Sequence, residues 1–278
     1  MHAILQCLER ANVRPKDVDL LVCATMTGDF VSPSTACLLQ HRLGCLAPAF
    51  DINAACAGFM YAFVTGAQFV RNGMARNALI VGTEVMTRTI DCTDKKTYPL
   101  FGDGAGAVLL QPIATELNQS DTIASTGILS YTLGSEGNSN ALCVPGGGSR
   151  EPLHACSFQE GRQYLKMDGR TVFKWAVRVV VDSTNDVLSA TGLVATEIDL
   201  VILHQANARI LDSAMEQLGI PKEKVLVNLH KFGNTSAASI PLALDEANQR
   251  GLLKRGDLVL MCGFGAGLAW GTALFRWM

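Results

Sequence analysis

The chain has 278 residues, of which 49% are hydrophobic and 17% are charged. This balance supports a large buried core, in one large or two moderate domains, and excludes an intrinsically disordered protein. Lys and Arg number 23 against 25 Asp and Glu, so the net charge is −2 and the basic excess typical of a nucleic-acid-binding protein is absent.

Neither a membrane helix nor an export signal is predicted. The longest apolar stretch, Leu258–Trp270, has 13 residues and contains three glycines, whereas a membrane-spanning helix needs about 20 apolar residues. The N-terminal sequence lacks the apolar core of a signal peptide. The nine cysteines include no CxxC pair, which argues against a disulfide framework or a zinc site and for reduced thiols. We therefore expect a cytoplasmic protein.

Buried-strand patterns alternate with helix patterns along the first half of the chain. Val18–Thr25, for example, is a continuous apolar run bounded by turn residues, which is typical of a parallel strand buried on both faces. The other predicted strands of this half are Ala47–Ile52, Ala78–Glu84 and Ala105–Gln111, and its predicted helices are Ser34–Leu43 and Ala57–Arg71. This alternation predicts an α/β fold.

The second half repeats the same order. Its predicted strands are Ile198–His204, Lys224–Leu229, Asp257–Phe264 and Leu268–Trp277, and its predicted helices are Ala208–Leu218 and Ala237–Arg250. We therefore divide the chain into two similar halves, residues 1–125 and 126–278. A less regular stretch, Ser130–Lys166, is expected to form a surface loop or a loop that covers a site.

The repeat also indicates that the first half lacks a strand. In the second half, a strand-like segment at Thr126–Tyr131 and a long helix at about Thr171–Ser189 precede the first repeated strand. In the first half, only a short helix at Met1–Ala11 precedes Val18–Thr25. Two explanations stay open, because the chain is either shortened at its N-terminus or built with a naturally shorter first repeat.

Three segments carry possible chemistry, and each follows a strand, where α/β proteins place their sites. The first segment holds Cys56, which lies between a strand and a helix. Backbone N–H groups and the helix dipole are expected to favour the thiolate there. Cys56 is therefore a candidate nucleophile, and the alternative is a buried structural cysteine.

The second segment follows the Ile198–His204 strand. His204 emerges into a polar turn, where it is placed to donate a hydrogen bond or to move a proton, and Asn207 is a good helix N-cap. The alternative for His204 is a structural histidine whose hydrogen bonds are satisfied.

The third segment contains Asn234, whose amide can both donate and accept. Thr235 and Ser236 are expected to cap the following helix, and on its own this segment indicates capping and nothing more. The repeat, however, aligns the Cys56 turn with the Asn234 turn. A pseudo-twofold axis is therefore predicted to bring Cys56, Asn234 and His204 together.

Four motifs in the chain, AACAGF, FGDGAGA, HQANARI and GNTSAAS, resemble those of the β-ketoacyl-acyl-carrier-protein synthase III enzymes of bacterial type II fatty-acid synthesis. The resemblance covers essentially the whole chain. It implies a thiolase fold, with two βαβαβαββ halves in a five-layered α/β/α/β/α arrangement, and a homodimer. Members of the family carry a further N-terminal strand and an adenine clamp, so we expect an exposed sheet edge and weaker coenzyme A binding in this chain.

The resemblance implies roles for the candidate residues. Cys56 is similar to the nucleophile that accepts the acyl group, and His204 and Asn234 to the pair that serves decarboxylation. Phe264 and Ala266 are similar to residues beside the acyl site. The family usually has glycine at the position of Ala266, but the backbone N–H survives that change and is an expected oxyanion donor.

Binding residues are also implied by the resemblance. Those for coenzyme A and pantetheine are Lys95, Gly169, Phe173 and Asn207, and those for the acidic carrier protein are Lys174 and Arg209. The chain departs from the family pattern at Lys95, where an arginine is common, and at Glu216 and Gln217, which replace a basic pair. The loop Asp29–Ser32 of a partner subunit is expected to line the acyl pocket.

The implied reaction is a decarboxylative Claisen condensation of an acyl-CoA primer with malonyl-acyl-carrier protein. It gives a 3-ketoacyl-carrier protein and initiates fatty-acid synthesis. No metal and no cofactor are implied, because the coenzyme A thioester is a substrate. The alternatives are a related thiolase-fold polyketide starter synthase or acyltransferase, and a catalytically impaired, truncated subunit.

Overall fold

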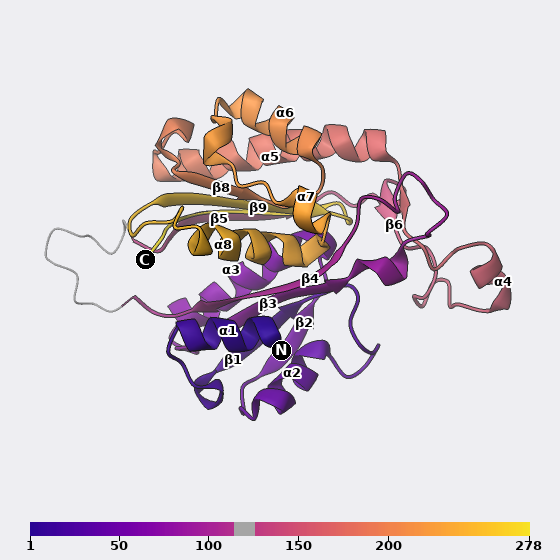
Figure 1. The fold of residues 1–278 in the computed structure, drawn as a ribbon, viewed down its shortest axis with the longest axis horizontal. Helices are drawn as coiled ribbons and strands as arrows, with labels where there is room; N and C mark the ends of the chain where they lie inside the picture. The colour runs from indigo at the N-terminus through magenta and orange to yellow at the C-terminus, as the bar shows by residue number, and fades with distance from the viewer. Residues whose placement is uncertain (114–125) are drawn as a thin grey trace, which may run out of the picture.

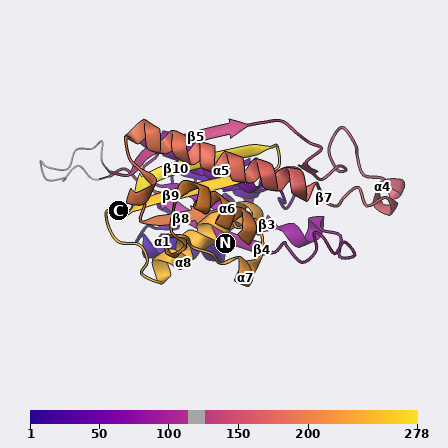
Figure 2. The same ribbon diagram turned by 90° about the horizontal axis from the view of Figure 1, so that it is seen from above.

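The computed structural model describes residues 1–113 and 126–278, which form the five layers α/β/α/β/α (Figure 1). Three layers of helices alternate with two sheets, and the long outer helix α5 crosses the face of the second sheet (Figure 2). The helix layers are, in spatial order, α1 (His2–Arg10) with α2 (Thr35–Leu43), α3 (Gly58–Arg71) with α8 (Ser239–Gln249), and α5 (Gly169–Thr191) with α6 (Ala208–Leu218). The five-layered fold that the family resemblance implied is therefore confirmed.

Each main sheet has four strands within the described residues. The first has the order β2-β1-β3-β4 and the second the order β5-β10-β9-β8, and in both one strand runs antiparallel to its neighbours: β4 against β3, and β10 against β9 and β5. The strands are β1 (Leu20–Ala24), β2 (Ala49–Ile52), β3 (Ala78–Val85), β4 (Asp103–Leu110), β5 (Ile128–Ser135), β8 (Leu200–Leu203), β9 (Leu258–Gly265) and β10 (Ala269–Arg276).

The two sheets differ at one edge. In the second sheet, β10 is flanked by β9 on one side and by β5 on the other. Its counterpart β4 pairs with β3 alone, and no described strand lies along its outer edge. This is the difference that the unequal repeats predicted. The predicted boundary between residues 125 and 126 falls at the end of the segment outside the described residues.

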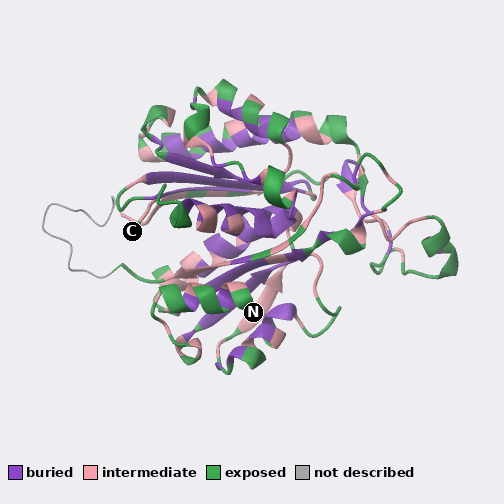
Figure 3. Cartoon of the chain, in the orientation of Figure 1, coloured by how far each residue is buried: buried purple, intermediate pink, exposed green. Residues whose placement is uncertain are grey.

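The middle helices are largely buried because a sheet packs against opposite faces of each of them (Figure 3). In α3, Phe59, Met60 and Phe63 are all buried, and they join Ile240 and Leu244 of α8 in one core between the sheets. This arrangement fixes the positions of the N-termini of α3 and α8, which lie beside the candidate site residues.

The outer helices bury only one face. In α5, Trp175, Val180 and Val187 pack on the second sheet while the opposite face is exposed. Asp168 caps the start of this helix by accepting hydrogen bonds from two backbone N–H groups, and Gly192 ends it in a left-handed conformation. Of the helices in the described parts of the chain, none is long and apolar enough to cross a membrane.

The prediction of a strand at Lys224–Leu229 is wrong. Only Val225 forms a bridge, to Val201 of β8, and a helical turn, α7 (Leu229–Phe232), follows. The buried side chain of Gln205 replaces the strand ladder here: its Nε2 donates to the Leu226 carbonyl at 3.2 Å, and its Oε1 accepts from the Asn228 N–H at 3.0 Å. The Leu226 N–H donates to the Val201 carbonyl at 3.1 Å, and the Gln205 side chain satisfies backbone groups on either side of Val227 that a longer strand would pair.

The stretch Ser130–Lys166 is irregular after β5. It contains the short antiparallel pair β6 (Leu142–Cys143) and β7 (Lys166–Met167) and a small helix, α4 (Ala155–Gln159), that projects from the body of the molecule (Figure 1). The pair β6–β7 lies over one end of the sheets, so this stretch covers the site described below.

Gly82 of β3 gives a test of how tightly the two halves fit. A Cβ added at Gly82 would collide with the carbonyl oxygen of Ala237, in the turn before α8. We expect Gly82→Ala to lower the free energy of unfolding by about 1–3 kcal/mol through overpacking, measured by urea denaturation. Gly137→Ala is the control, because a Cβ there meets no described atom within 4 Å. Equal stability of the two variants would contradict the tight fit.

Candidate active site

Cys56 lies in a short 3₁₀ turn, Ala55–Ala57, between β2 and α3. The turn forces Ala55 into the left-handed region, with φ of 45°, which costs a non-glycine residue energy and is often found at functional sites. Asn53 stabilises it, because its Oδ1 accepts a hydrogen bond from the Ala55 N–H at 3.2 Å. The turn places Cys56 at the start of the central helix.

The second half repeats this turn in detail. Asn234 Oδ1 accepts from the Ser236 N–H at 2.9 Å, and Ser236 has φ of 50° at the start of the 3₁₀ turn Ser236–Ala238, which precedes α8. Asn234 thus corresponds to Asn53, and Ala237 to Cys56. The predicted alignment of the two turns is confirmed, and the second half carries alanine where the first half carries the candidate nucleophile.

Leu100 and Gly102, which flank Phe101 at the start of the FGDGAGA segment, hydrogen-bond with the backbone of Asn234. The Asn234 N–H donates to the Leu100 carbonyl at 2.8 Å, and the Asn234 carbonyl accepts from the Gly102 N–H at 3.0 Å. A Cβ at Gly102 would collide with the Phe232 carbonyl. The glycine is therefore required for the close approach that positions Asn234.

His204 follows β8 and is 1% exposed. Its Nδ1 lies 2.7 Å from Ser239 Oγ, which also accepts a hydrogen bond from the Gln205 N–H at 3.4 Å. With that N–H donated to Ser239, the hydroxyl proton is available for His204 Nδ1, so we assign the ring proton to Nε2. Burial lowers the pKa of His204 to about 3, and the imidazole is neutral at physiological pH.

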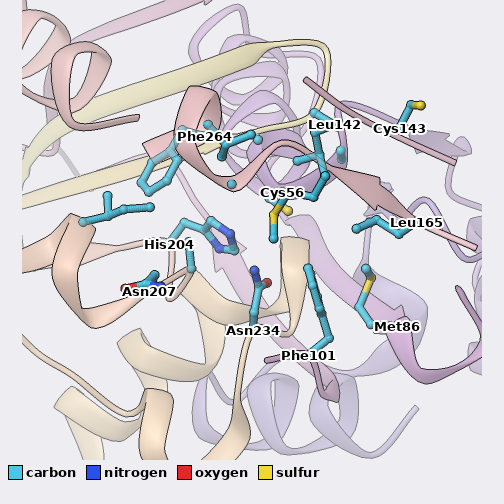
Figure 4. A pocket seen from close by; sticks show the side chains of 18 of the residues that line it. Cys56, Met86, Phe101, Leu142, Cys143, Leu165, His204, Asn207, Asn234 and Phe264 are labelled. Carbon is cyan, nitrogen blue, oxygen red and sulfur yellow. The ribbon is translucent and has the colours of Figure 1, made fainter. Parts of the chain in front are cut away.

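These three side chains meet in one cavity of about 140 Å³. Figure 4 shows the Cys56 sulfur, the His204 ring and the Asn234 amide pointing toward one another at its centre. They come from three separate turns, and the structure brings them together as the sequence predicted. The Phe264 ring meets the His204 ring edge-on, with a centroid distance of 5.3 Å, which fixes the orientation of the imidazole.

The other predicted site residues divide into two groups. Phe264, Ala266, Gly169, Phe173 and Asn207 all line the same cavity. Lys95, Lys174 and Arg209 do not line it and are exposed on the surface. The sequence missed the apolar wall, to which the Ser130–Lys166 stretch contributes Leu142, Val144 and Leu165.

The end of β9 packs directly on Cys56. A Cβ at Gly265 would lie 2.6 Å from the Cys56 Cβ and 3.2 Å from its Sγ, so only glycine fits this position. The close approach places the backbone of Gly265 and Ala266 beside the sulfur, where an oxyanion formed on a bound carbonyl needs donors.

The expectation that the helix terminus favours a thiolate at Cys56 is wrong. Burial raises the pKa of Cys56 to about 12, and the negative charge of Glu84 acts in the same direction. Hydrogen bonds from Ser236 and from the backbone act in the opposite direction without cancelling the effect of burial. The resting form is therefore the thiol, and a nucleophilic Cys56 needs an acceptor for its proton.

The capping roles expected for Thr235 and Ser236 are also wrong. The turn at Ser236 and helix α8 both begin without a side-chain cap. Instead, the Ser236 hydroxyl bonds with Glu84 Oε1 at 3.0 Å. Ser236, Ser239 and Glu84 are thus polar groups of the site that the sequence analysis did not assign. A carboxylate at the end of an otherwise apolar strand was the available signal for Glu84.

Comparison with known proteins places these features in a family. A family model described as 3-Oxoacyl-[acyl-carrier-protein (ACP)] synthase III matches residues 50–137, and its C-terminal counterpart matches residues 188–277. The beta-ketoacyl-[acyl-carrier-protein] synthases III of Rhodopirellula baltica and Desulfitobacterium hafniense (strain DSM 10664 / DCB-2) are 60% and 45% identical to the chain. Each alignment covers 99% of this chain, and 83% and 81% of those proteins.

Solved structures agree with this result. The 3-oxoacyl-[acyl-carrier-protein] synthase III of Aquifex aeolicus VF5 superposes with a TM-score of 0.85 at 42% identity, covering 99% of this chain and 82% of that one. The corresponding enzyme of Pseudomonas aeruginosa PAO1 gives a TM-score of 0.87 at 38% identity, with 99% and 81% covered.

The raised pKa of Cys56 predicts a particular alkylation profile. The rate of modification by iodoacetamide is expected to be low near pH 7 and to rise about tenfold per pH unit up to about pH 10, because only the thiolate reacts. Peptide mapping by mass spectrometry at each pH measures this rate, with the exposed Cys37 and Cys92 reporting on the reagent. A rate for Cys56 that levels off below about pH 8 would show that the thiolate is the resting form.

Proposed function

The chain belongs to the 3-oxoacyl-[acyl-carrier-protein] synthase III family, and we propose that Cys56, His204 and Asn234 carry out its reaction. The enzyme is an acyltransferase that condenses an acyl-CoA primer with malonyl-acyl-carrier protein, with loss of CO₂, and so initiates fatty-acid synthesis. Coenzyme A enters as part of a substrate, and the reaction needs no cofactor.

The observation that carries the assignment is the convergence of the three side chains in one cavity. In this proposal the two halves, residues 1–125 and 126–278, divide the chemistry. The first half supplies the nucleophile, and the second half supplies both groups that act on malonyl.

In the first half-reaction, Cys56 attacks the thioester carbonyl of the acyl-CoA. The backbone N–H groups of Cys56 and Ala266 lie where the tetrahedral oxyanion forms, and an oxyanion donor is typically worth about 3–4 kcal/mol. Collapse of the intermediate expels coenzyme A and leaves an acyl group on Cys56. This covalent intermediate makes the reaction ping-pong.

In the second half-reaction, malonyl on its carrier protein loses CO₂, and negative charge builds on the thioester oxygen. His204 donates to this oxygen from Nε2, because Ser239 occupies Nδ1. Asn234 donates from its amide nitrogen, because its Oδ1 already accepts from the Ser236 N–H. The carbanion then attacks the acyl group on Cys56 and releases the 3-ketoacyl-carrier protein.

The substrate path follows from the remaining cavity residues. Gly169 and Phe173 lie at the start of α5, and Asn207 at the start of α6, so pantetheine enters between these two helix termini. The cations Lys174 and Arg209 lie on the same two helices and are exposed, which suits contact with an acidic carrier protein. Lys95 is an exposed cation available to the coenzyme A nucleotide.

We further propose a cytoplasmic homodimer. The loop Asp29–Ser32 exposes Phe30 and Val31, with relative exposures of 63% and 106%, and β2 lies at an open edge of the first sheet. Phe30 and Val31 are adjacent, and contiguous exposed apolar side chains often mark a protein–protein contact. In the dimer, the loop of one subunit lines the acyl pocket of its partner.

The first functional prediction concerns the nucleophile. Cys56→Ala should abolish the covalent acyl-enzyme, because alanine has no sulfur to accept the group. Intact-protein mass spectrometry after mixing with acyl-CoA measures it. The matched control is Cys45→Ala, a buried cysteine that does not line the cavity. Acylation that persists in Cys56→Ala would show that another residue is the nucleophile.

The second functional prediction separates the half-reactions. His204→Ala and Asn234→Ala should each slow CO₂ release from malonyl-acyl-carrier protein by about 10²–10³-fold, because each removes one donor to the enolate oxygen. Acyl transfer to Cys56 should fall much less. Rapid-quench mass spectrometry follows acylation, and labelled malonyl follows CO₂ release. Equal losses in both steps would contradict the division of roles.

A further inference from the structure

Gln205 lies directly beside the proposed donor His204 in the chain, but its side chain does not line the cavity. The residue is 1% exposed, and a buried amide without partners would be costly. Its amide is fully bonded: Nε2 donates to the carbonyls of Leu203 at 2.9 Å and Leu226 at 3.2 Å, and Oε1 accepts from the Asn228 N–H at 3.0 Å. The reaction outlined above assigns no role to these bonds.

Two of these bonds hold the segment that leads to Asn234. Asn228 precedes α7 directly, and its carbonyl accepts from the Lys231 N–H at 2.9 Å. Asn234 follows Gly233, the residue that ends this helical turn. None of the four residues of α7 is buried. Side-chain packing therefore contributes little to the position of the turn, which depends on the hydrogen bonds at its two ends.

The bonds at the two ends of α7 lead to different halves of the fold. At the far end, the backbone of Asn234 is paired with Leu100 and Gly102, which belong to the first half. At the near end, the Asn228 N–H is paired with Gln205, on the segment that carries His204. Gln205 thus ties the near end of the turn to the segment of the second donor.

Asn234 therefore lies between two connections to consecutive residues. Upstream, α7 leads back to Gln205. Downstream, the turn Ser236–Ala238 leads to Ser239 of α8, whose Oγ lies 2.7 Å from His204 Nδ1. The backbone N–H of Gln205 donates to the same Oγ at 3.4 Å. The end of β8 thus holds the chain on both sides of Asn234.

The two proposed donors have to act on one atom (Figure 4). In the proposed reaction, the enolate oxygen accepts from His204 Nε2 and from the Asn234 amide nitrogen, and each donor has to lie about 2.7–3.1 Å from it. The backbone of His204 is fixed independently, because its N–H donates to the Cys262 carbonyl of β9 at 2.8 Å. A change at the Gln205 side chain is therefore expected to displace Asn234 and to leave His204 in place.

We propose, building on the proposed roles of His204 and Asn234, that Gln205 is a positioning residue for decarboxylation. Its side chain holds Asn234 at the distance from His204 that a shared enolate oxygen requires, and it touches neither the substrate nor the reacting atoms. Glutamine suits this task because its amide offers two N–H donors and one acceptor oxygen at once. An apolar side chain of the same length supplies neither, and a carboxylate supplies only the acceptor.

The first test is Gln205→Met, which keeps the length of the side chain and removes its hydrogen bonds. Release of CO₂ from malonyl-acyl-carrier protein is expected to slow by about 10²-fold, the usual cost of misplacing a catalytic group by ~1 Å. The kcat should fall while the KM for malonyl-acyl-carrier protein stays native, because the donors act in the transition state. Acylation of Cys56 should keep its native rate. Gln40→Met is the matched control, because Gln40 of α2 also donates to a backbone carbonyl, that of Cys45, and lies outside the cavity.

Double variants locate the effect at one donor. In the Asn234→Ala background, Gln205→Met should slow CO₂ release little further, because the donor that Gln205 positions is already absent. In the His204→Ala background, the same change should still slow CO₂ release, because Asn234 is then the remaining donor. Equal additional losses in both backgrounds would show a general effect on the fold and would overturn the positioning role.

Gln205→Glu offers a rescue that depends on pH. The protonated carboxyl donates to one backbone carbonyl and accepts from the Asn228 N–H, whereas the ionised carboxylate would face the carbonyls of Leu203 and Leu226 without a donor. The ratio of CO₂ release to acylation should be near native at about pH 6 and should fall toward about pH 9, because burial raises the pKa of a carboxyl. The native ratio, measured in parallel, corrects for other titrations. The titratable groups on the surrounding elements are a neutral His204 and side chains that already have partners, namely Lys224, Lys231, Glu246 and Arg250.

The outcomes separate this proposal from the proposed function. If His204→Ala and Asn234→Ala both impair CO₂ release but Gln205→Met does not, the positioning role is wrong and the two donors stand. If His204→Ala and Asn234→Ala release CO₂ at the native rate, the proposed function of these donors is itself wrong. Should Gln205→Met fail to fold, as shown by circular dichroism, Gln205→Glu decides the question, and a ratio that does not follow the pH overturns the proposal.

Discussion

Each half of the fold packs the turn before its central helix against a strand of the other half, backbone against backbone, and the cavity depends on this contact. Gly263 and Gly265 of β9 approach the Cys56 turn, while Gly82 of β3 approaches the Ser236 turn. Side chains at these positions would force the turns apart. Because the contact is made twice around a pseudo-twofold axis, groups from three distant parts of the sequence arrive at one point with little freedom to move.

The same tight packing sets the protonation of the site. His204 and Cys56 are both buried, and burial favours the neutral form of both side chains. A neutral imidazole is still a donor, and an enolate oxygen needs a donor more than it needs a full charge. A neutral thiol, by contrast, is a poor nucleophile. Burial thus keeps His204 in the neutral donor form that the second half-reaction uses. In the first half-reaction, it makes an acceptor for the Cys56 proton necessary.

Sequence reasoning predicted most of the architecture because the two halves repeat one pattern of buried strands and helices. It also predicted that Cys56, His204 and Asn234 converge, as they do in one cavity, since each follows a strand at an equivalent or neighbouring position in the repeat. It failed at Lys224–Leu229, where an apolar run with strand character takes its hydrogen bonds from the side chain of Gln205. No local pattern reveals a partner contributed by a residue more than 20 positions away.

The electrostatic errors have a different origin. The expectation of a thiolate rested on the helix terminus, which is visible in the sequence, whereas the burial that raises the pKa of Cys56 is not. The roles of Ser236 and Ser239 were hidden for a related reason. In sequence they are small polar residues at a helix start, where capping is the usual interpretation, and only the three-dimensional packing shows that they face Glu84 and His204.

The buried helices of the middle layer, α3 and α8, join the two halves of the molecule to each other. α3 and α8 are each covered by both sheets. Separating the two halves would therefore expose buried apolar surface on both helices, and neither half would keep a complete core. The two repeats can be recognised in the sequence and in the fold, but they are not independent in their stability. We therefore expect heat or denaturant to unfold both halves together rather than at separate melting temperatures.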